Sequence, residues 1–190
     1  MDLGLLLSDP VAAGALVGAL ALVLLGAAWH KVSEPAAFQS ALVAYRLLPD
    51  GLAVPAARLV PLLEGGLALG LLVPATRSAA LLGAAALLAT YAVAMAINLA
   101  RGRHHIDCGC GGSGQALSWS LVARNGVLVL LALAFSGPTT GREFTWLDGV
   151  VLVAGALSLL AAYLLADEML RQATRMARTA DETANRSTLS

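Results

Sequence analysis

The feature that most constrains this chain is a series of long apolar runs that contain almost no charged residues. Each run approaches or exceeds the roughly 20 residues that an α-helix needs to cross about 30 Å of hydrocarbon. Alanine, leucine, valine and glycine dominate them, without the alternation typical of strands in a membrane barrel. We therefore predict an all-α membrane protein, a multi-pass bundle of four to five transmembrane helices. The runs are Val11–Ala28, Leu52–Val73, Ser78–Leu99, Leu117–Phe135 and Trp146–Ala166.

Composition supports this class and excludes others. Hydrophobic residues make up 58% of the 190 residues and charged residues only 13%, whereas about a quarter of a soluble domain is charged. The 12 basic residues balance the 12 acidic ones, so there is no basic footprint for nucleic acid. Residues 1–10 lack the basic segment of a cleavable signal peptide, and the first run is predicted to be a retained helix. We expect one transmembrane domain in the lipid bilayer over residues 1–170 and a polar tail over 171–190.

The loop between the first two runs, His30 to Pro55, is too long for a tight hairpin. The spacing of Phe38, Leu42 and Tyr45 predicts a short amphipathic helix at the membrane surface. His30 and Lys31, at the end of the first run, are interpreted as interfacial anchors, because lysine extends its ammonium toward water. A quinone headgroup site near this interface is the other interpretation.

The distribution of basic residues bears on orientation. With five spans, the first loop, the cysteine loop and the tail share one side, together with ten of the twelve lysines and arginines; Arg77 and Arg142 lie opposite. The positive-inside rule then places the cysteine loop in the cytoplasm. If the fourth run, with its Arg124-Asn125, does not span, the tail and the cysteine loop lie on opposite faces. A cytoplasmic tail then leaves the cysteines outside.

Cys108 and Cys110 are the only two cysteines and lie one residue apart in a polar, glycine-rich loop. A structural disulfide stabilises a protein by closing a long loop, and this pair closes almost none. Its value is therefore chemical: a redox dithiol, half of a metal site, or two thiols that the loop merely tolerates. We favour the redox dithiol, because the histidine–cysteine spacing matches no standard structural zinc pattern. Nearby basic side chains favour the thiolate: Arg101, Arg103, His104 and His105.

Polar residues inside the apolar runs are the second group of candidates. Glu64 lies near the middle of the second run, where a carboxylate normally faces the bundle interior and has a partner. Arg124 is the predicted partner, and the pair is either a structural clamp or part of a substrate or proton path. For Asn98 and Asn125 we favour hydrogen bonds between helices over ligand binding.

Several of these residues occur in a pattern that resembles the MauE family of methylamine utilisation proteins. The resemblance runs from about residue 18 to 131, and the Cys-Gly-Cys-Gly loop followed by Arg-Asn is its most specific part. The matching positions are Lys31, Phe38, Tyr45-Arg46-Leu47-Leu48-Pro49, Pro61-x-x-Glu64, Asn98-Leu99-x-Arg101-Gly102, Cys108-Gly109-Cys110-Gly111 and Arg124-Asn125.

The resemblance implies a fold, a location and a role. The fold is a four-helix core like that of the DoxX-like proteins and vitamin K epoxide reductase, and the location is the inner membrane. The role is maturation of the small (β) subunit of methylamine dehydrogenase, a disulfide-rich periplasmic protein. Cys108 and Cys110 would exchange electrons with a thioredoxin-like, MauD-like periplasmic partner. The alternative is a membrane scaffold or metal-delivery protein that performs no exchange.

Overall fold

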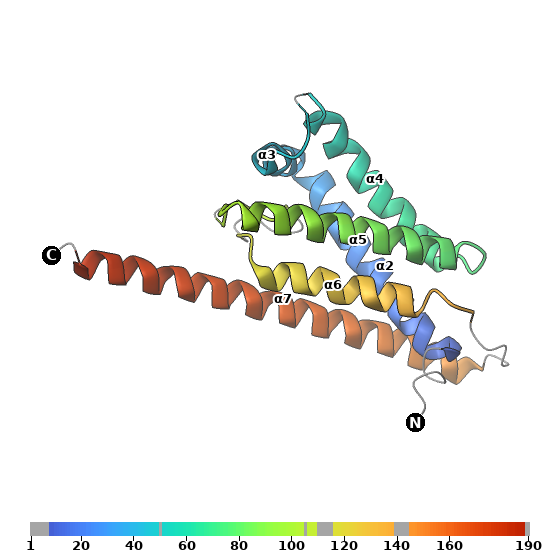
Figure 1. The fold of residues 1–190 in the computed structure, drawn as a ribbon. Coiled ribbons are helices and arrows are strands. Elements are labelled where there is room, and N and C mark those ends of the chain that lie inside the picture. The colour runs from blue at the N-terminus through green and yellow to red at the C-terminus, as the bar shows by residue number, and fades with distance from the viewer. Residues whose placement is uncertain (1–7, 50, 105, 110–115, 139–144, 189–190) are drawn as a thin grey trace.

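The computed structural model describes residues 8–49, 51–104, 106–109, 116–138 and 145–188. Within these ranges the chain is helical apart from its connections and one isolated bridge between Asp107 and Ala116 (Figure 1). The predicted all-α class is confirmed. The helices are α2 (Pro10–Ser33), α3 (Pro35–Tyr45), α4 (Ala53–Leu72), α5 (Arg77–Ala100), α6 (Trp119–Ala134) and α7 (Trp146–Thr188).

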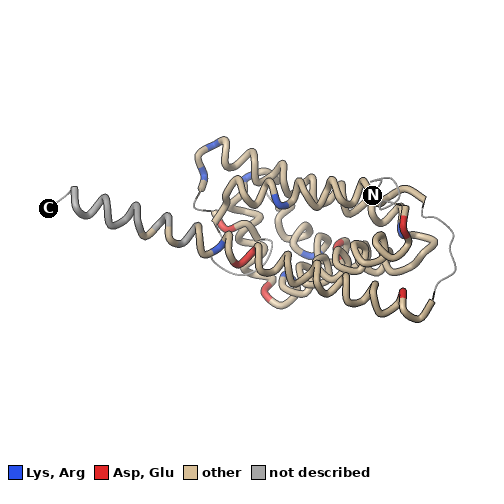
Figure 2. Tube along the Cα trace, turned by 90° about the horizontal axis from the view of Figure 1, so that it is seen from below, with Lys and Arg blue, Asp and Glu red and all other residues tan. Residues whose placement is uncertain are grey.

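Four helices have the length and hydropathy to cross a membrane: α2, α4, α5 and, in α7, the segment Trp146–Ala173. The fourth predicted run forms the shorter helix α6, whose 16 residues extend about 24 Å. Most of the length of the helices carries no charge (Figure 2). The chain is therefore a multi-pass membrane protein, with four long helices and one shorter one.

The order of the helices places the connections at two ends. Helix α6 packs along α5, and α2 packs against both α4 and α7. Because α6 runs back alongside α5, the loop after α5, helix α3 and the C-terminal half of α7 share one end of the bundle (Figure 1). We refer to it as the loop end. In the described part of the chain the loop after α5 and the C-terminal half of α7 thus lie at the same end of the bundle, as the five-span prediction has them.

Small residues let the helices approach closely in the core. A buried cluster joins α2, α4, α5 and α6 through leucines such as Leu24, Leu71 and Leu81, which are at most 1% exposed. Alanines such as Ala68 and Ala84, both fully buried, fill the space between them. In a membrane, such close packing stabilises helix association because lipid supplies no hydrophobic driving force.

Helix α2 begins after a capping aspartate. The Asp9 side chain accepts hydrogen bonds from the backbone N–H groups of Val11 and Ala12, both at 2.9 Å. Pro10 occupies the first helical position, where its missing N–H leaves no hydrogen bond unmade.

Glycines set the crossing of α2 and α7. A Cβ atom on Gly18 would lie 3.1 Å from Ala156 Cβ, and one on Gly155 would lie 3.0 Å from Ala15 Cβ. Gly14 faces Leu152 on the same side of α2. The pair Gly14-x-x-x-Gly18 is therefore a packing motif that brings two backbones together.

The crossing can be tested with a matched pair of substitutions in α2. Gly18→Val should lower the free energy of unfolding by about 1–3 kcal/mol, because the added methyls overpack a contact between backbones. Gly26→Val makes the same chemical change where a Cβ would meet nothing within 4 Å. Circular dichroism of unfolding in detergent measures both, and equal losses would contradict the assignment of Gly18 to the crossing.

Candidate functional site

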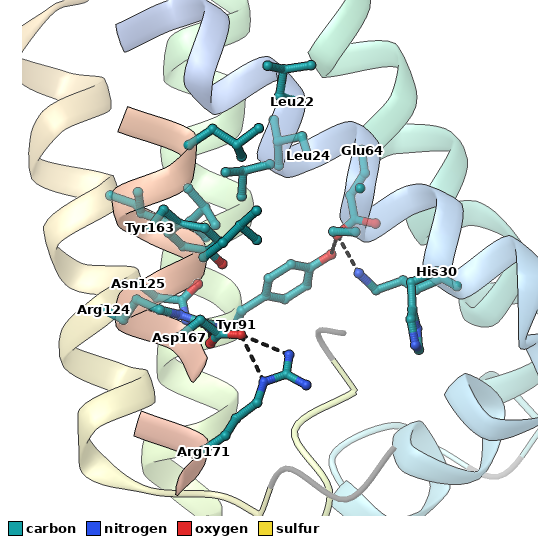
Figure 3. A pocket seen from close by; sticks show the side chains of 18 residues that line it. Leu22, Leu24, His30, Glu64, Tyr91, Arg124, Asn125, Tyr163, Asp167 and Arg171 are labelled. Carbon is teal, nitrogen blue, oxygen red and sulfur yellow. Dashed lines mark hydrogen bonds and ion pairs between the residues drawn. The ribbon is translucent and has the colours of Figure 1, made fainter. Parts of the chain in front are cut away.

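A buried ion pair connects three helices near the loop end. Lys31 of α2 donates to Oε1 of Glu64 in α4 at 2.6 Å, and the two side chains are 2% and 0% exposed. The hydroxyl of Tyr91 in α5 donates to the same oxygen at 2.8 Å (Figure 3). The Lys31 ammonium also lies 5.3 Å from the ring centroid of Phe38 and 5.5 Å from that of Tyr91, within range for cation–π attraction.

This arrangement corrects two predictions. Glu64 pairs with Lys31 and not with Arg124, because α4 packs against α2 and α5. Lys31 is not an exposed interfacial anchor, since its side chain is buried in the bundle. Arg124 pairs instead with Asp167 of α7.

The pair of Arg124 and Asp167 is the centre of a second charged group. The Arg124 guanidinium lies 5.4 Å from the ring centroid of Tyr163, one turn before Asp167 on α7. Arg171 donates to the other carboxylate oxygen of Asp167 through Nη2 at 2.8 Å and Nε at 3.0 Å. The Asp167 carboxylate therefore pairs with both Arg124 and Arg171, and its pair with Arg124 links α6 to α7.

A cavity of about 420 Å³, which we call the polar cavity, lies between these two charged groups. Leucines such as Leu22 and Leu24 line one end and Arg171 lies at the other (Figure 3). Oε2 of Glu64 is buried and has no hydrogen-bond partner among the described residues. The polar side chains of the wall are His30, Lys31, Glu64, Tyr91, Arg124, Asn125, Tyr163, Asp167 and Arg171.

Cys108 is held against α3. Its side chain is 5% exposed, and its backbone carbonyl accepts a hydrogen bond from the Tyr45 hydroxyl at 3.0 Å. Gly109 adopts a left-handed φ of 68°, and a Cβ there would lie 3.3 Å from Ala41 Cβ and 3.6 Å from the Phe38 ring. Helix α3, which was predicted from the spacing of Phe38 and Tyr45, therefore positions the cysteine loop.

A second, apolar cavity of about 250 Å³, which we call the cysteine pocket, lies between α3, α4 and α5. Cys108 and Gly109 form part of its wall beside Phe38. Lys31 and Tyr91 line this pocket and also the polar cavity. The buried ion pair therefore lies between the two cavities.

The other predicted site residues have varied positions. Arg101 and His104 are exposed, while Arg103 contacts Asn98 through its backbone N–H at 3.0 Å and through Nη1 at 3.5 Å. His105 and Cys110 lie outside the described residues. No group of three histidine, cysteine, aspartate or glutamate side chains that could hold a metal occurs in the part of the chain that the structure describes.

Both intramembrane asparagines donate hydrogen bonds within their own helices. Asn98 donates to the carbonyl of Ala94 at 3.1 Å, and Asn125 donates to the carbonyl of Leu121 at 2.9 Å. Oδ1 of Asn98 also accepts from Arg103 in the loop after α5. Among the described residues, the predicted hydrogen bond from these side chains to another helix is not seen.

Sequence reasoning missed Tyr91 and Asp167. Asp167 follows directly after the fifth apolar run, a position that is easily interpreted as the start of a polar tail. Tyr91 gave no signal, because a tyrosine in an apolar run is ordinary core material.

Comparison with known proteins matches this chain to one family. The family described as "Methylamine utilisation protein MauE" matches residues 9–137. A protein of Paracoccus denitrificans named methylamine utilization protein MauE is 39% identical over 158 residues, which cover 81% of this chain and 85% of that one. Proteins of the same name from Methylorubrum extorquens and Methylophilus methylotrophus are 38% and 36% identical; the alignments cover 81% and 84% of this chain and 79% and 83% of theirs. No solved structure matches the chain.

The buried ion pair predicts a specific pattern of stability. Lys31→Met should lower the free energy of unfolding by about 3–5 kcal/mol, because it leaves a buried carboxylate unpaired. The double variant Lys31→Met, Glu64→Leu removes both charges and should recover most of that loss. Unfolding in detergent measures all three proteins, and a double variant no more stable than Lys31→Met would contradict the pairing.

Proposed function

Since the chain belongs to the MauE family of methylamine utilisation proteins, we propose that it is a thiol–disulfide exchange protein of the inner membrane. Its task would be maturation of the small (β) subunit of methylamine dehydrogenase by disulfide formation. The observation that carries this proposal is the environment of Cys108. The residue is buried in the wall of an apolar pocket, and its backbone carbonyl accepts a hydrogen bond from the Tyr45 hydroxyl.

The proposed exchange conserves atoms and electrons. A thiolate of the substrate protein attacks the Cys108–Cys110 disulfide, forming a mixed disulfide and releasing one cysteine of the pair as a thiolate. A second substrate thiolate then attacks the mixed disulfide. The substrate leaves with a disulfide, and Cys108 and Cys110 are reduced by two electrons and take up two protons. A ring closed by cysteines one residue apart is strained and easily reduced, which favours this direction.

The proposed partners are a thioredoxin-like, MauD-like periplasmic protein and the small subunit itself. Arg101 and His104 are exposed beside the cysteine loop, where they would meet a docking protein. These partners require the loop end to face the periplasm, although the positive-inside rule favours the cytoplasm. The positive-inside rule counts basic residues in the connecting loops on each side of the membrane. Lys31 and Arg124 are not counted, because they lie within helices and form ion pairs.

The cycle needs an oxidant for the reduced pair, and we propose a lipid-soluble quinone. The cysteine pocket is apolar and bounded by Phe38, Tyr45 and Tyr91, and a cation, Lys31, lies in its wall. Aromatic walls suit a planar ring, and an ammonium or hydroxyl group can polarise a quinone carbonyl. The two thiols would give two electrons and two protons to the quinone, yielding the disulfide and the quinol.

The alternative function is a scaffold or metal-delivery protein that holds the maturation partners without exchange. It predicts that the thiols are dispensable, or that they bind a metal in the purified protein. Metal analysis of wild type and of the variants described next separates these outcomes.

Trapping tests the exchange. Cys110→Ala and Cys108→Ala each retain one thiol, and at least one of them should accumulate a mixed disulfide in cells, because the resolving cysteine is missing. Non-reducing electrophoresis and mass spectrometry identify the attached protein. The variant lacking both cysteines is the control.

If neither single variant traps a partner and both still support dehydrogenase assembly, thiol exchange is refuted. The orientation is measured on the same strains. A membrane-impermeant maleimide applied to intact cells should label the reduced loop if it faces the periplasm.

Blocking the cysteine pocket tests the quinone. Leu42→Trp places an indole in the pocket wall, whereas Val43→Trp adds the same group at the next residue, which is 58% exposed and outside the pocket. Oxidation of the reduced protein by a short-chain ubiquinone should slow at least tenfold in Leu42→Trp and remain unchanged in Val43→Trp. Equal rates in both would contradict the proposed quinone site.

A further inference from the structure

The polar cavity lies where α2 and α7 separate, and its wall is charged at one end and apolar at the other. The two helices meet where Gly14 and Gly18 face Leu152 and Ala156, and then diverge toward the loop end (Figure 1). The cavity lies in the resulting gap and is open to the surroundings of the bundle. Leu22 and Leu164 in its wall are 39% and 54% exposed. Its side therefore faces lipid.

The charged end of the cavity follows the uncharged part of α7. Residues 149–166 contain no charged residue and extend about 27 Å, close to the thickness of the hydrocarbon core. Asp167 and Arg171 come next, near the end of the segment long enough to cross the membrane, which would place them at headgroup depth. Leu160 and Leu164 line the cavity one to two turns deeper. The cavity thus joins the headgroup layer to the acyl-chain layer.

The charges favour an anion. Three basic side chains and two acidic ones line the cavity, which leaves one net positive charge when His30 is neutral. Arg124 and Arg171 share the single carboxylate of Asp167, so the surplus lies at the interfacial end. A cationic end at headgroup depth above an apolar wall is the chemistry that binds anionic lipid.

From this geometry we propose that the polar cavity binds an anionic phospholipid. Its phosphate lies at Arg171 and one acyl chain lies along Leu22, Leu160 and Leu164. The proposal does not depend on thiol exchange, which takes place on the other side of the Lys31–Glu64 pair. The lipid would brace the diverging halves of α2 and α7 and hold the loop end open around its buried charges.

Native mass spectrometry of the full chain tests the site. The delipidated protein is titrated with phosphatidylglycerol or with phosphatidylcholine, and one tightly bound phosphatidylglycerol is expected. Removing one cation near an anionic headgroup, as in Arg171→Gln, should weaken that binding about fivefold. Arg58→Gln is the matched control, because Arg58 is exposed near the start of α4 at the same end, outside the cavity.

A second variant tests the apolar wall of the polar cavity, and its helicity shows whether the protein still folds. Leu160→Trp fills the chain-binding wall without changing charge and should lower phosphatidylglycerol occupancy at unchanged helicity. The proposal is overturned by equal binding of both lipids, by equal effects of Arg171→Gln and Arg58→Gln, or by an unaffected Leu160→Trp. Displacement of the lipid by millimolar inorganic phosphate would assign the site to free phosphate, and a co-purifying quinone in the cavity would overturn it as well.

Discussion

The interaction on which the rest of the structure depends is the buried pair of Lys31 and Glu64. Moving two charges out of water is unfavourable, and their attraction offsets this only when the geometry is good. Here one carboxylate oxygen accepts from both Lys31 and Tyr91, so a rotation of α2, α4 or α5 breaks at least one of these hydrogen bonds. The pair therefore specifies the register of three helices more than it adds to stability.

The position of Lys31 also affects the cysteine loop, because α3, which contacts that loop, follows Lys31 closely in the chain. Helix α3 begins at Pro35, four residues after Lys31, so fixing Lys31 fixes where α3 starts. Helix α3 in turn supplies Tyr45, which holds the Cys108 carbonyl, and Phe38, which packs against Gly109. The intramembrane charges and the cysteine loop are thus one structural unit, although they are far apart in the sequence.

The sequence was sufficient for the fold and for half of the site. Apolar runs of spanning length leave a chain few alternatives, and the helix at Phe38–Tyr45 depends on a local pattern. Glu64, Arg124 and Cys108 stood out because a charge in hydrocarbon or an isolated cysteine pair is rare. Their partners could not be predicted, since pairing depends on how each helix is rotated about its axis. Glu64 faces α2 and Arg124 faces α7, and periodicity in an apolar run without a polar face does not determine that rotation.

The two ends of the bundle differ in a way that bears on reactivity. At the α2–α7 crossing, glycine and alanine bring the backbones together. At the loop end, charges and aromatic rings hold the helices apart around two cavities. Cys108 lines the apolar one and is only 5% exposed, so its position would suit a small lipid-soluble reactant better than a folded protein. In the proposed cycle, the position of Cys108 therefore suits transfer to the membrane acceptor more than first contact with a protein partner.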